Sequence, residues 1–161
     1  MNTGEIKSES NKQVQQDNSS RECGMMVTAG VQGVGKTYQN MYIIKNYVQD
    51  KLSTRVPGRK CLIFDTNGEY TEEQFGKNGI PNFKVKRIAI KDIEAWGRSP
   101  IVECRRIDAK NLSIKEKKAF IEYILRVYRS GCLILEDINS YILSVTHMED
   151  IVGGLVNLRH R

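Results

Sequence analysis

Apolar residues along this chain occur either in short continuous runs or at helical spacing. Three runs, at residues 25–29, 61–64 and 132–135, are mainly apolar, and each is followed by a glycine or an acidic residue. Short runs bounded by turn residues are typical of buried strands. We therefore predict a strand at each of the three places.

Helical spacing begins at Lys36 and returns twice later in the chain. The first segment ends before Pro57-Gly58, and its apolar face is formed by Met41, Ile44, Val48 and Leu52. Ser113 and Glu116 have the spacing of a capping box. They open a second helix, which ends before Gly131 and whose apolar face comprises Phe120, Ile121, Ile124, Leu125 and Tyr128. A second such box, Thr146 with Glu149, opens a final helix that carries Ile151, Leu155 and Leu158.

The stretch between residues 71 and 101 has a mixed pattern. It predicts a short strand at 83–90 and a loop at 97–100, and a further strand is expected at 101–107. Strands that alternate with amphipathic helices indicate an α/β domain built on a mainly parallel sheet flanked by helices.

The chain has 161 residues, which fits one domain at about 150 residues per domain. Residues 1–22 are polar and aperiodic, so we expect a disordered tail followed by a single domain at 23–161. No apolar run approaches the roughly 20 residues that span a bilayer, and residues 1–22 lack the features of a signal peptide. A cytoplasmic protein without a membrane span is therefore expected.

Charge and cysteine content add little to this picture. The formal net charge of +6 favours anionic partners, but the basic clusters at 105–106, 115–118 and Arg126/Arg129 fit solvated surfaces as well as a DNA track. The 4 cysteines contain no C-x-x-C pair, which indicates buried thiols and not a zinc site or a disulfide framework.

The sequence between the first predicted strand and the first predicted helix is a phosphate-binding motif. Gly30 to Thr37 matches G-x-x-x-x-G-K-[ST], and its glycines allow backbone N–H groups to turn toward phosphate oxygens. Lys36 is expected to contact the β- and γ-phosphates, and the Thr37 hydroxyl to ligate Mg²⁺. The cofactors are then ATP and Mg²⁺. The predicted binding set is Gly30, Val31, Gln32, Gly33, Val34, Gly35, Lys36, Thr37 and Tyr38.

Two strands end in acidic residues, and they suggest different enzymes. Asp65 to Gly68 fits the D-x-x-G of a GTPase, but the N/T-K-x-D motif that reads guanine is absent from the sequence. Glu136-Asp137 instead fits the acidic end of a Walker B strand. There we assign Glu136 to the metal and Asp137 to the attacking water, with the reverse assignment left open.

Three segments of the chain resemble the HerA/FtsK superfamily of P-loop ATPases. They are the phosphate loop, the sequence from Leu62 to Tyr70, which is similar to the family's h-h-D-x-x-G-E-Y, and Leu133 to Asp137 as the acid-acid Walker B. The resemblance implies a RecA-like (ASCE) core that hydrolyses ATP as a homo-oligomeric ring. It implies work on DNA, such as translocation or packaging in a virus or mobile element.

The resemblance adds further candidate residues and one discrepancy. Asp65 and Glu69 belong to the family motif, and Arg159 and Arg161 are candidate arginine fingers that act across a subunit boundary. The family continues with a sensor strand and a last strand that these residues lack, so a core incomplete at the C-terminus is expected. The alternatives are a nucleotide-binding switch or assembly module with little turnover, a GTPase that uses Asp65, and a small-molecule kinase.

Overall fold

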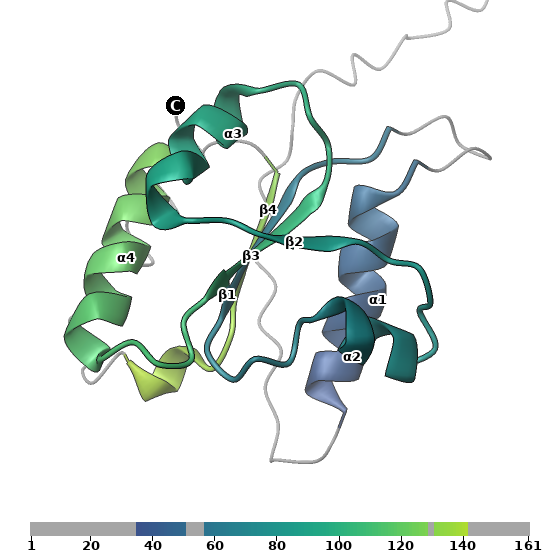
Figure 1. The fold of residues 1–161 in the computed structure, drawn as a ribbon, viewed down its shortest axis with the longest axis horizontal. Coiled ribbons are helices and arrows are strands. Elements are labelled where there is room, and N and C mark those ends of the chain that lie inside the picture. Colours follow the sequence, from purple (N-terminus) through teal and green to yellow (C-terminus); the bar gives the residue numbers. More distant parts are fainter. Residues whose placement is uncertain (1–34, 51–56, 129–130, 142–161) are drawn as a thin grey trace, which may run out of the picture.

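A computed structural model describes residues 35–50, 57–128 and 131–141 (Figure 1). They form an α/β fold in which a four-stranded parallel sheet is flanked by helices, with the strand order β2-β3-β1-β4. In chain order the elements are α1 (Lys36–Val48), β1 (Cys61–Asp65), α2 (Glu72–Lys77), β2 (Val85–Arg87), the 3-10 helix η1 (Ile90–Asp92), α3 (Ile93–Arg98), β3 (Cys104–Asp108), α4 (Ile114–Val127), β4 (Cys132–Leu135) and the 3-10 helix η2 (Ile138–Ser140).

The register aligns the carboxyl ends of the strands at one edge of the sheet. Asp65 at the end of β1 is opposite Asp108 at the end of β3, and Phe64 is opposite Leu135, so that Glu136 follows directly beyond β4. In open α/β sheets this edge is the usual place for a ligand. At the opposite edge, Cys61, Cys104 and Cys132 are aligned across three strands as free thiols. Cys61 and Cys104 are buried, as the sequence predicts, whereas Cys132 is half-buried and Cys23 lies outside the described residues.

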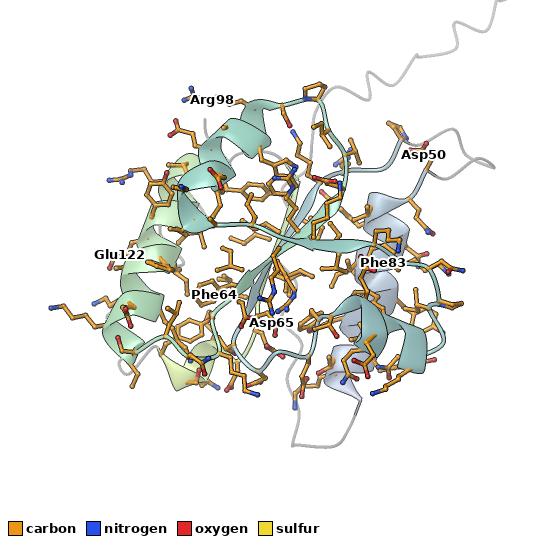
Figure 2. The ribbon with its side chains drawn as sticks, in the orientation of Figure 1. Asp50, Phe64, Asp65, Phe83, Arg98 and Glu122 are labelled. Atoms are coloured by element: carbon orange, nitrogen blue, oxygen red, sulfur yellow. The ribbon has the colours of Figure 1, made fainter. Side chains whose placement is uncertain are left out.

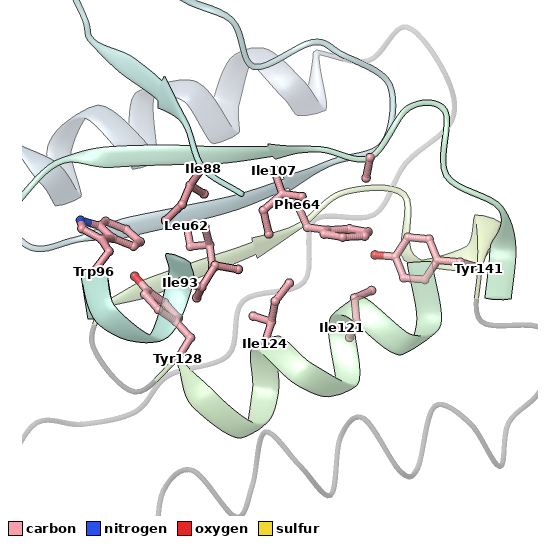
Figure 3. Close-up of a cluster of buried hydrophobic side chains, with 11 residues drawn as sticks. Leu62, Phe64, Ile88, Ile93, Trp96, Ile107, Ile121, Ile124, Tyr128 and Tyr141 are labelled. Atoms are coloured by element: carbon pink, nitrogen blue, oxygen red, sulfur yellow. The ribbon is translucent and has the colours of Figure 1, made fainter. Parts of the chain in front are cut away.

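Helices cover both faces of the sheet (Figure 1). α1 and α2 pack on one face through Met41, Ile44 and Phe75, and α3 and α4 pack on the other. On the α4 side, Phe64 of β1 lies above Ile121 and Ile124 (Figure 3). Burial of each such side chain contributes about 1.5–3 kcal/mol, so these two layers hold the sheet in place.

The apolar runs at 61–64 and 132–135 and the first capping box give the right elements. The strands at 61–64 and 132–135 and the helix after Ser113 are confirmed within one or two residues. The Ser113 hydroxyl accepts a hydrogen bond from the Glu116 amide, and the Glu116 carboxylate accepts one from the Ser113 amide at 2.8 Å. This capping box satisfies donors at the start of α4, as its sequence indicates.

Several predicted boundaries are wrong for identifiable reasons. The strand expected at 101–107 starts only at Cys104, because its neighbours β1 and β2 begin in register with that residue, at Cys61 and Val85. The strand expected at 83–90 is limited to Val85–Arg87. The loop expected at 97–100 begins two residues later, since α3 continues to Arg98.

The first helix is also shorter than its apolar pattern suggests. α1 ends at Val48, and Gln49 takes an extended conformation. The returning chain then passes so close that a Cβ atom at Gly58 would lie 1.9 Å from the Val48 carbonyl oxygen. Gly58 is therefore required where the chain turns back toward β1.

Some expectations concern parts of the chain outside the described residues. They are the tail at 1–22, the strand at 25–29, residues 30–34 of the phosphate loop, Leu52, the final helix from Thr146, and the candidate fingers Arg159 and Arg161. Among the helices that the structure describes, none is long and apolar enough to cross a membrane.

Candidate functional site

The described end of the predicted phosphate-binding motif forms the start of α1. Gly35 precedes the helix with φ +78°, a left-handed conformation that favours glycine. Lys36 and Thr37 are the first two residues of the helix and are half-buried. Tyr38 is 48% exposed, and its ring centroid lies 4.9 Å from that of Tyr42.

The turn after β1 directs a run of backbone amides at two carboxylates. The amides of Thr66 and Asn67 donate to Glu136 Oε2 at 3.0 and 3.1 Å. The next three amides donate to Asp65: those of Gly68 and Glu69 to Oδ1 at 2.8 and 3.0 Å, and that of Tyr70 to Oδ2 at 3.2 Å. Gly68 allows this path because its φ is +77°. The D-x-x-G-E-Y segment is thus a turn whose backbone amides donate hydrogen bonds to the Asp65 and Glu136 carboxylates.

Asp65 lies at the carboxyl end of β1 (Figure 2), and its side chain is fully buried. Besides three amides it accepts a hydrogen bond from Arg106, whose Nη1 lies 2.9 Å from Asp65 Oδ2. Arg106 is itself buried, and its other terminal nitrogen lies 3.7 Å from Asp108. Both oxygens of Asp65 are therefore used inside the protein.

Sequence reasoning missed the part that Arg106 plays. It treats residues 105–106 as a basic cluster, yet Arg106 is in the buried Asp65 pair and Arg105 pairs with Glu103. The alternation of side chains along β3 could have revealed this role. Arg106 lies two residues after the buried Cys104, so the two side chains are on the same face of the strand. A charged residue at an inward position requires a partner of opposite charge.

Glu136 is held against the same turn. Its pKa is raised from 4.5 to about 7, mainly by burial and then by the hydrogen-bonded Asp65 carboxyl group, while the Asn67 amide acts in the opposite direction. The Glu136 carbonyl oxygen accepts a hydrogen bond from the Tyr141 hydroxyl at 3.0 Å. Asp137 follows with φ +45° and is exposed to solvent.

Thr37 connects α1 to the turn. Its hydroxyl donates to Glu69 Oε2 at 2.6 Å, and three residues further along α1 the Asn40 amide nitrogen lies 3.2 Å from the Tyr70 hydroxyl. The structure therefore brings Thr37 together with Glu69, and Glu136 together with the Thr66 and Asn67 amides. Within the described residues no hydrogen bond joins Thr37 to Glu136.

The donor atoms at this edge suit a hard divalent cation. Thr37, Glu69 and Glu136 offer a hydroxyl and carboxylates, the oxygen ligands that Mg²⁺ prefers. Across the ranges described, no three acidic, histidine or cysteine side chains converge on a metal cage. Mg²⁺ in nucleotide sites takes one or two protein ligands, with phosphate and water completing its shell, so these residues fit it without a cage.

Comparisons with protein-family models, curated proteins and solved structures yield no match for this chain. The fold class is therefore defined by the structure alone, as an α/β fold with a four-stranded parallel sheet flanked by helices.

Proposed function

We propose that this chain is a P-loop ATPase that binds ATP with Mg²⁺ and hydrolyses it at the carboxyl edge of the sheet. One observation carries the proposal. Thr37, from the end of the phosphate-binding motif, is hydrogen-bonded to Glu69 in the turn that also holds Glu136. Three segments far apart in the sequence thus meet where a parallel α/β sheet usually binds its ligand.

The residues at this edge have separate tasks in the proposed reaction. Lys36 contacts the β- and γ-phosphates as a point charge, and the backbone N–H groups of the motif's glycine-rich part, which precedes Lys36, hold phosphate oxygens. Bound Mg²⁺ supplies charge neutralisation at the phosphates. The acidic residues orient the metal and polarise the attacking water, tasks that the sequence assigns to Glu136 and Asp137.

The turn geometry favours an ATPase over a GTPase that uses Asp65. In the D-x-x-G assignment, Asp65 serves Mg²⁺ and Gly68 the γ-phosphate. Here the Asp65 carboxylate is buried among four donors, and the Gly68 amide donates to Asp65 itself at 2.8 Å. The Asp65 carboxylate and the Gly68 amide therefore already have hydrogen-bond partners within the protein.

The resemblance to the HerA/FtsK superfamily extends the proposal to DNA. In this extension the chain forms a homo-oligomeric ring that uses ATP hydrolysis to move or package DNA, and Arg159 and Arg161 are arginine fingers between subunits. The all-parallel sheet with helices on both faces supports the coarser part of that resemblance.

Calorimetry with ATP, GTP and Mg²⁺ tests the binding site. We expect the wild-type protein to bind ATP, and Lys36→Ala to lose most of the affinity while keeping its circular dichroism spectrum. Lys45→Ala, in the last turn of the same helix, is the matched control and should bind normally. Unchanged ATP binding by folded Lys36→Ala would refute the assignment of the site.

Steady-state hydrolysis with and without DNA tests the activity. Stimulation by DNA supports a motor, whereas binding with negligible turnover supports a switch or assembly module. Turnover that depends on a small-molecule acceptor would indicate a kinase.

A further inference from the structure

Glu69 and Thr37 form a short contact within the candidate site. The Thr37 hydroxyl donates to Glu69 Oε2 at 2.6 Å, a length typical of a hydrogen bond to a charged carboxylate. Glu69 is exposed, and among the described residues Thr37 is the one hydrogen-bond donor to its carboxylate. The other oxygen of this carboxylate is thus open to a ligand from solvent.

The other two carboxylates of the turn are used differently. Asp65 is fully buried, and both of its oxygens accept hydrogen bonds from amides or from Arg106. Glu136 is half-buried, and its Oε2 is held by the Thr66 and Asn67 amides. Glu69 alone of the three is both exposed and in contact with the hydroxyl that is expected to ligate Mg²⁺.

A hydroxyl that gives a lone pair to a cation still has a proton to donate. A carboxylate that accepts a hydrogen bond from this hydroxyl fixes its orientation and increases the electron density on its oxygen. The hydrogen bond from Thr37 to Glu69 has this arrangement. The sequence assigns the corresponding place to Glu136, whose contacts lie on the turn instead.

We propose that Glu69, and not Glu136, is the residue that positions Mg²⁺ at this site, by accepting the hydrogen bond from the Thr37 hydroxyl and by holding the hydrated ion with its exposed oxygen. The inference rests on the proposed nucleotide site and names the residue that governs its metal dependence. It leaves Glu136 to act on the water or on the turn.

The test compares ATP affinity with Mg²⁺ and with EDTA, measured by calorimetry for each variant. The ratio of the ATP affinity with Mg²⁺ to the ATP affinity with EDTA reports metal positioning. If Glu69 had a purely structural role, its substitution would not change this ratio. In Glu69→Gln the ratio should fall about 10- to 100-fold, the usual effect of losing an outer-shell partner. Gln can still accept the Thr37 hydrogen bond, so the change removes mainly the negative charge.

One variant is the control, and a second variant tests the competing assignment. Glu73→Gln, on the exposed face of α2, removes a nearby carboxylate whose side chain is 72% exposed and should leave the ratio unchanged. Glu136→Gln tests the competing assignment of the metal, and the ratio should fall more in Glu69→Gln than in Glu136→Gln. Circular dichroism and a melting curve confirm that each variant is folded.

The outcomes separate this inference from the proposed function. A ratio preserved in Glu69→Gln, or reduced at least as much in Glu136→Gln, overturns the role of Glu69 while ATP binding itself stands. A wild-type protein that binds ATP equally well with and without Mg²⁺ also overturns it. A wild-type protein that binds no ATP overturns the proposed function and this inference together.

Discussion

Arg106 and Asp65 form a buried ion pair between β3 and β1, with 2.9 Å between Arg106 Nη1 and Asp65 Oδ2. The Arg106 side chain is 6% exposed and that of Asp65 is not exposed at all. The pair continues outward through Asp108 to Arg87 on β2, so charges of alternating sign follow the carboxyl edge of the sheet. Asp65 in turn holds three amides of the turn that contains Glu69.

Loss of Arg106 should therefore destabilise the whole protein. Arg106→Met leaves Asp65 as an uncompensated buried charge, for which we expect a loss of about 3–5 kcal/mol in the free energy of unfolding. The double variant Arg106→Met/Asp65→Asn should recover part of that loss, because no unpaired charge remains. Urea denaturation monitored by circular dichroism measures both values.

Arg98→Met is the control for a charge pair on the surface. Arg98 bonds to Glu94 one turn away on α3, and its side chain is 80% exposed. Its removal should cost less than about 0.5 kcal/mol. Equal losses for Arg98→Met and Arg106→Met would contradict the buried pair as the anchor of the turn.

Asp137 should matter for hydrolysis and little for binding or folding. It has φ +45°, is exposed, and makes no capping hydrogen bond to η2. Asn tolerates the left-handed conformation as well as Asp, so Asp137→Asn should fold normally and bind ATP with Mg²⁺ at wild-type affinity. Hydrolysis should fall about 100-fold or more if the carboxylate polarises the water. Single-turnover measurements with saturating protein check this, and wild-type rates in Asp137→Asn would remove Asp137 from the mechanism.

Glu136 should make the stability of the metal-free protein depend on pH. Its pKa is raised from 4.5 to about 7 in the folded protein, so the folded state holds this proton more tightly than the unfolded chain does. The stabilising contribution is then complete below pH 4.5 and is lost as the pH rises through 7. Denaturation in EDTA at several pH values should show this loss in the wild-type protein and a smaller one in Glu136→Gln.

The control for this pH dependence is Glu122→Gln, on the exposed face of α4. Its stability curve should run parallel to that of the wild-type protein across the same range. A Glu136→Gln curve parallel to the wild type would show that Glu136 titrates normally.

The parts of the fold that the sequence predicts are those with a local signal. β1 and β4 are continuous apolar runs, and the helix at Ser113 has a complete capping box. α2 has only six residues with one buried side chain, Phe75, which is too few to show a helical period. Its local signals are confined to its ends, such as Thr71, whose hydroxyl accepts a hydrogen bond from the Gln74 amide at 3.2 Å.

The candidate site depends more on contacts between distant segments. Motif spacing selects Thr37, Glu69 and Glu136, but it does not reveal that Thr37 contacts Glu69, which is 32 residues away. That contact depends on how α1 packs against the turn. Arg106 and Tyr141 belong to no motif, and their roles arise from the strand register and from the fold of η2 over β4.

Tyr141 should position Glu136 for the proposed reaction. Its ring is 2% exposed and packs edge-to-face on Phe64, with 5.8 Å between ring centroids, while its hydroxyl donates to the Glu136 carbonyl oxygen at 3.0 Å. Tyr141→Phe keeps the ring and removes this hydrogen bond, which should cost about 1 kcal/mol of stability. It should also lower kcat without changing ATP affinity, since the backbone that precedes Asp137 loses its anchor.

Tyr128→Phe is a matched control at the opposite end of β4. There the Tyr128 hydroxyl donates to the Cys132 carbonyl oxygen at 3.3 Å, and the ring is 4% exposed. The stability loss should be similar, because the same kind of hydrogen bond is removed, but kcat should be unchanged, because Cys132 is at the start of the strand, away from Glu136. Equal losses of kcat in Tyr141→Phe and Tyr128→Phe would show that Tyr141 acts only through stability. A loss confined to Tyr141→Phe, with ATP affinity intact in both variants, would place the end of β4 in the reaction.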